Sequence, residues 1–453
     1  MVGPKMAENF FKNLTLTKII LTALIIRLLL LPWVYHGDVT VTYWWGKFAS
    51  EFGWRGYYDW LNFGGYGRPD QPMLNIYYDW SVRQIYLFFY DIFWFLNTHI
   101  SLFPSKFMQW YFINGNQILL KLPMVFSDIF LIFLSYKFFL KIFNSQKAKI
   151  IAIVLTFYLP LIYNSAVWGS GDSIINLFGL LCVYLVWQKK YISSALFFLL
   201  SILYKSSLLI WIPIIIVSLI KNNIKRTEIC KATIFFLLFI SLVSFPFTPL
   251  GINPLIWFFQ TMLTKILPGA MPQLTANAFN FWALLYGLKP QLDEIILFGG
   301  FSARMISIVL CFIGYLIICR KLYLNYNLKN LLLSLVNISL VTFVFMTRMH
   351  ERYTFPALIP LLILCFYDKK FIKYFVVLTI THLLNVYNWW WVPTIHPLED
   401  FLSNNIVIKT ISLTNLCITL LLLFFNFSIP IEADNSPIRS RNGLIKSNNS
   451  RIK

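Results

Sequence analysis

Charged residues are scarce in this chain of 453 residues. Only 12% of its residues are charged, against about a quarter in soluble domains, whereas 58% are hydrophobic and 19% are aromatic. So few charges cannot cover the apolar surface of a water-soluble fold of this length. The composition excludes a soluble globular protein and predicts that lipid covers most of the surface.

Signatures of nucleotide, dinucleotide and metallopeptidase chemistry are also missing. The sequence contains no Walker loop, no GxGxxG fingerprint, no HExxH pair and no nucleophile elbow. Its six cysteines lie in or beside apolar runs without disulfide or metal-site spacing, which indicates packing roles. The net charge of +20 is divided into short clusters rather than gathered in a stripe with aromatic platforms. Nucleic acid is therefore not an expected partner.

Long apolar runs dominate what is present. A helix needs about 20 apolar residues to cross the hydrocarbon core of a bilayer. The predicted spans are 17–35, 118–140, 149–167, 172–188, 190–204, 206–220, 231–249, 301–319, 330–347, 353–367, 371–388 and 406–427. The first run has no small-residue cleavage site after it, which indicates a signal anchor. The expected fold is an all-α polytopic membrane protein with about twelve transmembrane helices.

Basic residues then predict the sidedness of the chain. The short aromatic run 85–95 contains Asp91, so we assign it to the membrane interface rather than to a further span. With the N-terminus inside, 24 of the 38 Lys and Arg residues lie in cytoplasmic segments, and a further span would move most of them outside. The resulting organisation is a transmembrane domain at 1–430 with long external loops at 36–117 and 250–300, followed by a basic, disordered cytoplasmic tail at 431–453.

Acidic residues show the opposite distribution, since 13 of the 18 are external or intramembrane. Asp38 follows the first predicted span directly, which would place its carboxylate at the membrane surface. A partly desolvated carboxylate has a raised pKa and can accept a proton from a hydroxyl group. Asp38 is therefore the candidate catalytic base, although the same position also suits an aspartate that caps the following helix.

Two further external acids have comparable alternatives. Asp70 lies in the segment Arg68–Pro72, where two prolines make a rigid entry turn before an aromatic helix. It becomes a substrate-binding candidate if it faces the same cavity as Asp38. Asp172 ends the segment Trp168–Asp172, whose glycines allow close approach of another chain or a ligand. A helix cap alone does not require that preceding segment.

External cations suggest an anion site. Lys205 is the only cation in its turn, where it can extend to the interface or neutralise a lipid phosphate. Arg348, His350, Glu351 and Arg352 follow one another closely between two spans, and Arg binds phosphate through a bidentate fork. An ion-paired turn would explain Glu351 and one arginine but would leave the other cation without a role.

Amides and aromatics complete the set of candidates. The external stretch 275–282 includes Asn277 and Trp282, side chains that suit hydrogen bonding and stacking against sugars. Arg27 and Asp128 lie inside predicted spans. A polar contact between helices explains each of them, and Arg27 could also balance an active-site carboxylate.

The order of these motifs resembles the GT-C superfamily of membrane glycosyltransferases. The chain is similar in particular to bacterial mannosyltransferases related to the second mannosyltransferase of GPI-anchor synthesis, from about residue 20 to residue 390. The motifs that carry the resemblance are Gly37-Asp38, Gln71–Leu74, Trp168–Asp172, Lys205, Asn277–Trp282 and Met349–Tyr353. Gln71 and Met73 depart from the prolines and leucines usual in these relatives, which leaves the substrate less defined than the fold.

The resemblance implies a GT-C-type bundle that transfers a sugar, with mannose expected, from a polyprenyl-phosphate donor to a lipid-linked or envelope glycan. Transfer would be inverting, with Asp38 as general base, at the outer face of a bacterial plasma membrane. The implied ligands of the donor phosphate are Lys205, Arg348, His350 and Arg352, and those of the acceptor are Asp70, Asp172, Glu351, Asn277 and Trp282. No resident cofactor is implied, and a divalent cation is used by some members only.

The alternative from another functional class is a transporter or flippase of a lipid-linked glycan. Such proteins keep polar residues along a path through the bundle and often contain broken helices near the membrane midplane. Here the unusual polar residues gather at one face and most apolar runs are unbroken. The pattern favours the enzyme.

Overall fold

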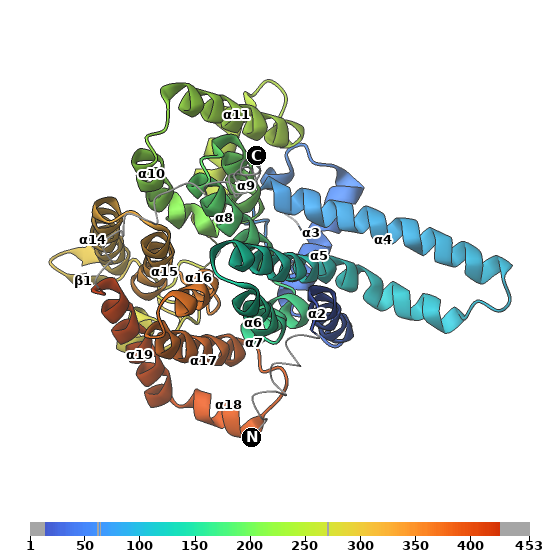
Figure 1. Cartoon of the computed structure of the whole chain (residues 1–453). Coiled ribbons are helices and arrows are strands. Elements are labelled where there is room, and N and C mark those ends of the chain that lie inside the picture. Colours follow the sequence, from blue (N-terminus) through green and yellow to red (C-terminus); the bar gives the residue numbers. More distant parts are fainter. Residues whose placement is uncertain (1–13, 61–62, 64, 270, 426–453) are drawn as a thin grey trace, which may run out of the picture.

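The computed structural model describes residues 14–60, 63, 65–269 and 271–425. This part of the chain is mainly helical, with almost no sheet (Figure 1). The N-terminal half contains α2 (Leu16–Leu30), α3 (Gly37–Phe52), α4 (Met73–His99), α5 (Ser105–Ile142), α6 (Ser145–Thr156), α7 (Leu159–Ile162), α8 (Asp172–Trp187) and α9 (Tyr191–Tyr204). The predicted tail at 431–453 lies outside the described residues.

The C-terminal half continues the same helical architecture. It contains α10 (Ile212–Lys221), α11 (Arg226–Ser244), α12 (Pro254–Thr261), α13 (Phe281–Tyr286), α14 (Ala303–Leu324), α15 (Leu328–Phe345), α16 (Phe355–Tyr367), α17 (Phe371–Trp389), α18 (His396–Ser403) and α19 (Asn405–Leu423). Short 3-10 or π turns are η1 (Tyr57–Asp59), η2 (Tyr163–Trp168), η3 (Ser206–Trp211), η4 (Phe245–Phe247) and η5 (Met262–Ile266). Two strands, β1 (Ile296–Phe298) and β2 (Phe301–Ser302), pair antiparallel in the second long loop.

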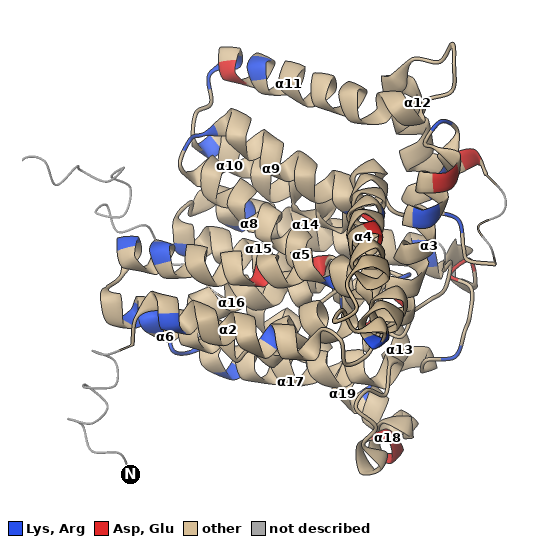
Figure 2. Ribbon diagram, turned by 90° about the vertical axis from the view of Figure 1, so that its right-hand side faces the viewer, with Lys and Arg blue, Asp and Glu red and all other residues tan. Residues whose placement is uncertain are grey.

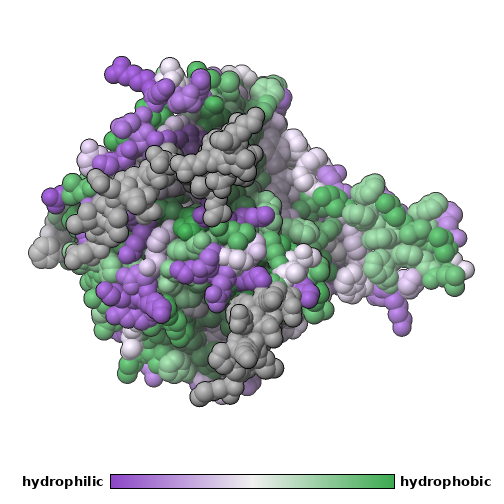
Figure 3. All heavy atoms as spheres, viewed as in Figure 1, coloured by the Kyte–Doolittle hydropathy of each residue, from purple (hydrophilic) through white to green (hydrophobic). Residues whose placement is uncertain are grey.

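Apolar helices confirm an all-α membrane protein. Five described helices are long and apolar enough to cross a membrane, or six if a bent pair counts as one span. In α11 and α14 only 17% and 28% of the apolar window is buried inside the protein. The remaining apolar surface faces outward, as expected of helices in contact with lipid. Figure 3 shows hydrophobic side chains around the rim of the bundle.

Helix α15 forms the centre of the bundle. Its apolar window is 83% buried, and it packs against α14, α16 and α19. A helix buried on all sides must satisfy its polar side chains internally. Ser339 accordingly accepts a hydrogen bond from the Trp211 indole at 3.0 Å, and Asn337 donates to the carbonyl of Leu422 at 3.2 Å.

One predicted span, 149–167, is not a straight helix. It is divided into α6 and the α7–η2 segment, which meet at a bend of 49°. The cause is Pro160, because a proline has no N–H to donate to the carbonyl of Thr156 one turn earlier. The predicted span is therefore present as a bent pair of helical segments, one of the exceptions among the mostly unbroken runs.

Arg27 donates hydrogen bonds to carbonyl groups at this bend. Its guanidinium donates to the carbonyls of Leu155 and Thr156 at 3.3 and 3.2 Å, and its Nε lies 2.7 Å from Asp128 Oδ2. Both charged side chains are fully buried, and Ser165 also donates to Asp128. Of the two roles considered for Arg27, the structure supports the polar contact between helices.

Helices α4 and α5 form a long projecting hairpin. The run 85–95 lies within α4, and α5 begins thirteen residues before the predicted span at 118. Tyr86 stacks on Tyr111 with ring centroids 5.2 Å apart, and Phe93 lies 5.0 Å from Phe107. Figure 1 shows the pair extending sideways, and Figure 2 shows α4 end-on where α9, α11 and α15 lie across the view. α4 therefore crosses the bundle direction steeply, as expected of an interfacial helix.

Charges separate towards two ends of the bundle. Lys and Arg gather where α5 and α10 end and where α6 and α11 begin, and most acids lie towards the opposite end, near α3, α4 and α18 (Figure 2). We call these the lysine-rich face, which includes Lys137, Lys141 and Lys221, and the acidic face, which includes Asp38.

Replacing Arg27 tests the role of the buried pair. The Arg27→Met substitution leaves the Asp128 carboxylate buried without its cation, which costs about 3–5 kcal/mol of folding free energy. Thermal unfolding of the detergent-purified protein should show a large loss, and Arg27→Met/Asp128→Leu should recover part of it. The control is Arg320→Met, which replaces an exposed arginine near the end of α14. Equal losses of melting temperature in Arg27→Met and Arg320→Met would contradict the buried ion pair.

Candidate functional site

The site begins at the first turn of α3. His36 is the N-cap of this helix, and its Nδ1 accepts a hydrogen bond from the backbone N–H of Asp38 at 3.0 Å. Because His36 caps the helix, the Asp38 side chain is not needed for that purpose. The positive end of the helix dipole nevertheless favours a carboxylate in this first turn.

Asp38 is held from two other segments of the chain. The Trp168 indole donates to Oδ2 at 3.0 Å, and Arg352 Nη2 lies 3.2 Å from the same oxygen. Burial raises the pKa of Asp38, but the Arg352 guanidinium and His36 more than offset burial, so this pKa lies well below its usual range. Its side chain is still 42% exposed.

Arg352 connects three carboxylates. Its Nε lies 3.1 Å from Asp172 Oδ2, and its Nη1 donates to Glu351 Oε1 at 2.6 Å, in addition to the contact with Asp38. The guanidinium also lies over the Trp168 ring, 5.3 Å from its centroid. These carboxylates raise the pKa of Arg352 despite its burial. One side chain thus joins the starts of α3 and α8 to the turn before α16.

Lys205 completes the cluster from the turn between α9 and η3. Its Nζ donates to Asp172 Oδ1 at 2.5 Å and lies 5.4 Å from the centre of the Tyr353 ring. Ser170 donates to Asp172 Oδ2 at 2.9 Å. Asp172 is therefore both the first residue of α8 and a fully bonded partner of two cations.

The cluster carries more negative than positive charge when the histidines are neutral, because Asp38, Asp172 and Glu351 face only Arg352 and Lys205. Side-chain exposure is 6% for Asp172, 1% for Glu351, 13% for Arg352 and 10% for Lys205, against 42% for Asp38. Both cations are already paired, so a phosphate must compete with carboxylates for them. Of these three acids, Asp38 is the one whose side chain is accessible to solvent or substrate.

Asp70 and His350 lie at the edge of the cluster. The Gln71 amide donates to Asp70 at 2.9 Å, and His350 Nδ1 lies 3.8 Å from Glu351 Oε2. Burial raises the pKa of Asp70, an effect that Gln71, Lys205 and His350 only partly offset. Asp70 therefore lies within electrostatic reach of Lys205, His350 and Asp38. Its role in binding stays a prediction.

Three predicted residues have different partners. Arg348 Nε lies 2.7 Å from Asp293 Oδ2, and Nη1 donates to the carbonyl of Pro268 at 2.6 Å. Trp282 is buried and donates to the carbonyl of Phe345 at 2.9 Å. Asn277 forms a backbone bridge with His350. These contacts hold the second long loop against the cluster rather than presenting Arg348 and Trp282 to a ligand.

An aromatic wall beside Asp38 was missed by sequence reasoning. The His36 ring stacks on Trp168 at 3.9 Å between centroids, and Trp390 packs edge-on against both at 4.8 and 5.6 Å. Trp390 belongs to the run 389–391, which resembles the many aromatics expected at a membrane interface. The neighbouring sequence does not distinguish Trp390 from other interfacial aromatics, because its partners lie more than 200 residues away.

A divalent cation does not fit this arrangement. No group of three His, Cys, Asp or Glu side chains among the described residues lies close enough to hold a metal ion. The oxygens of Asp172 and Glu351 are directed at Lys205 and Arg352 instead. Asp172 and Glu351 thus already use lone pairs on cationic side chains.

Gly171 permits the close packing of Tyr204 against the site. A Cβ at Gly171 would lie 2.3 Å from Tyr204 Cε1, whereas a Cβ at Gly37 would have no atom within 4 Å. We expect Gly171→Ala to lower the free energy of unfolding by about 1–3 kcal/mol through overpacking. Gly37→Ala, the control in the same site, should leave thermal unfolding nearly unchanged, and equal melting of both variants would refute the packing argument.

Acid should remove the contribution of Asp38 to stability. Its pKa is lower in the folded state than the unfolded value of about 3.9, so the stabilisation is present above that value and is lost as pH falls through the folded pKa. The difference in melting temperature between wild type and Asp38→Asn should therefore narrow below about pH 4. A difference that stays constant from neutral pH down to pH 3 would contradict the ion pair.

Comparison with models of known protein families gives no match for this sequence, and comparison with curated protein sequences gives none either.

Proposed function

We propose that the protein transfers a sugar, mannose, from a polyprenyl-phosphate donor to a hydroxyl group of a lipid-linked or envelope glycan. The observation that carries this proposal is Asp38, an exposed carboxylate held beside a buried guanidinium and an indole at one end of an apolar bundle. A glycosyl transfer with a phosphate leaving group needs a base for the acceptor hydroxyl and a cation for the leaving phosphate in one site. Asp38 and Arg352 meet that requirement.

Bond changes follow directly from this pairing. The acceptor hydroxyl gives its proton to Asp38 while its oxygen attacks the anomeric carbon from the side opposite the phosphate. The bond between the anomeric carbon and the phosphate oxygen breaks, and its electron pair leaves with the lipid phosphate. Arg352 and Lys205 stabilise the charge that develops on that oxygen. The product has the inverted anomeric configuration.

Competition for Arg352 links donor binding to the base. In the free protein, Arg352 lies 3.2 Å from Asp38 and lowers its pKa, so Asp38 is a weak proton acceptor. A donor phosphate that binds Arg352 draws the guanidinium away from Asp38 or shares it. The pKa of Asp38 then rises, and the carboxylate becomes a stronger base once the donor is present.

We propose a twelve-span GT-C bundle with its acidic face outward. Besides the five long helices and the bent α6–α7–η2 pair, the remaining spans are α2, α8, α9, η3–α10, α16 and α17. The positive-inside bias supports a cytoplasmic lysine-rich face. The site would then lie on the outer side of a bacterial plasma membrane, where polyprenyl-phosphate sugars rather than nucleotide sugars serve as donors.

The broken span α6–α7 is the observation that favours the rival function, a flippase of lipid-linked glycans, because transporters often use such breaks. Here Arg27 and Asp128 fill the break with hydrogen bonds. Towards the lysine-rich face the packing of α5, α8 and α15 is apolar, with Leu131, Leu177 and Leu335 buried. These features support a site at one face over a polar path.

Removing the base should remove the activity. We expect Asp38→Asn to lower transfer from polyprenyl-phosphate mannose to extracted envelope acceptors by about 100-fold or more. Asp91→Asn, which changes an exposed acid on α4 in the same external segment, is the matched control and should be as active as wild type.

Two outcomes would overturn the proposal. Equal transfer by wild type and Asp38→Asn would move the base elsewhere, and transfer directly from a UDP- or GDP-sugar would refute the donor class. Movement of a lipid-linked sugar across vesicles without any donor, unchanged in Asp38→Asn, would support the flippase instead.

A further inference from the structure

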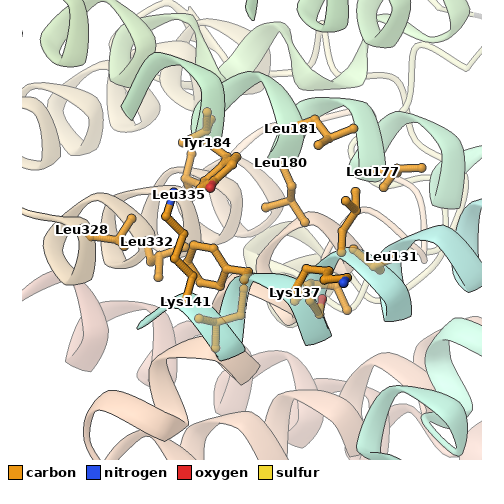
Figure 4. A pocket seen from close by; sticks show the side chains of 16 residues that line it. Leu131, Lys137, Lys141, Leu177, Leu180, Leu181, Tyr184, Leu328, Leu332 and Leu335 are labelled. Atoms are coloured by element: carbon orange, nitrogen blue, oxygen red, sulfur yellow. The ribbon is translucent and has the colours of Figure 1, made fainter. Parts of the chain in front are cut away.

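A cavity of about 300 Å³ lies between α5, α8, α15 and α16, at the end of the bundle opposite Asp38. Figure 4 shows leucine side chains from α5, α8 and α15 around it, including Leu180 and Leu332, with Lys137 and Lys141 on one side. No residue of the Asp38 cluster lines it. It is therefore separate from the site described above.

Its depth follows from the directions of the helices. α5 runs towards the lysine-rich face, so Leu131 lies deeper than Lys141, and α15 runs the opposite way, so Leu335 lies deeper than Leu328. Leu131 and Leu335 are buried, whereas Lys141 is exposed. The cavity is thus apolar at its inner end and basic at its mouth.

We propose that this cavity binds an anionic glycerophospholipid of the leaflet at the lysine-rich face. An acyl chain would occupy the leucine-lined interior, and the phosphate would meet Lys137 and Lys141. Basic pockets between transmembrane helices are known binding sites for anionic head groups. An apolar interior offers no hydrogen bonds to water, whereas an alkyl chain gains by leaving polar surroundings.

Charge supports an anionic occupant. Lys137 and Lys141 are one helical turn apart, where like charges destabilise a helix, and no acid pairs with either in the described part of the chain. A phosphate between the two ammonium groups would remove that repulsion. Lys137 otherwise lies over the ring of Phe133, 5.6 Å from its centroid.

The chain's own remaining segments are poor occupants on the same grounds. Residues 1–13 contain two lysines and one glutamate, and residues 426–453 contain five basic and two acidic residues. Both segments are net basic and would be repelled by Lys137 and Lys141. The surrounding bilayer, in contrast, supplies anionic head groups together with acyl chains.

Native mass spectrometry of the full-length protein tests this inference. The probes are phosphatidylglycerol and phosphatidylcholine, added separately to delipidated protein in detergent. We expect wild type to retain phosphatidylglycerol about tenfold better, and Lys137→Gln/Lys141→Gln to lose this preference. Lys369→Gln/Lys370→Gln, a pair of exposed lysines near the same face that do not line the cavity, should keep it.

Substitutions that fill the cavity distinguish lipid binding inside it from attraction of lipids to surface charge. Leu180→Trp should reduce retention of both lipids, and Leu181→Phe provides a smaller change if Leu180→Trp melts below wild type. An unchanged lipid preference in Lys137→Gln/Lys141→Gln, or unchanged retention in both filled variants, would overturn the proposal. Displacement of phosphatidylglycerol by polyprenyl phosphate alone would also overturn it, by assigning the cavity to the sugar donor. None of these readouts depends on sugar transfer.

Discussion

The guanidinium of Arg352 is the interaction on which the site depends. It contacts Asp38, Asp172 and Glu351, from three segments that are far apart in the sequence, and Asp172 in turn holds Lys205. Charges removed from water must be paired, and removal of one partner is far more costly than the net gain from the pair. The bundle must therefore bring the starts of α3 and α8 to the turn before α16. That requirement positions Asp38 while leaving its side chain accessible.

The remaining architecture keeps this charged cluster at one end of an apolar body. α15 is buried along its length, and the break at Pro160 is closed by Arg27 rather than left as an opening. The α4–α5 hairpin lies steeply to the bundle (Figures 1 and 2) and adds apolar surface beside the acidic face, with Phe88 and Phe112 exposed. The two ends consequently differ in chemistry: one offers a base beside a cation, and the other a leucine-lined cavity with two lysines.

Sequence reasoning was strongest where the controlling interactions are local. The apolar runs predicted most helix positions within a few residues. Asp38, Asp172, Lys205 and Arg352 were selected from local features: the position after a span, a glycine-containing turn, a lone cation in a turn and a cluster of cations between two spans. Which side chains contact each other across the fold was not predictable from these local features. The pairing of Arg348 with Asp293, like the wall formed by Trp390, depends on how distant loops pack, and neither residue differs locally from its neighbours.

The coupling between Asp38 and Arg352 is the central claim, and a double-mutant cycle on sugar transfer tests it most directly. Transfer from polyprenyl-phosphate mannose would be measured for wild type, Asp38→Asn, Arg352→Gln and the double variant, with melting recorded for each. If the two residues act as a unit, the losses of transfer rate are strongly non-additive. The double variant then transfers sugar at least as fast as the less active of the two single variants. Losses that simply add, with all four proteins folded, would show that Asp38 and Arg352 act independently and would contradict the account.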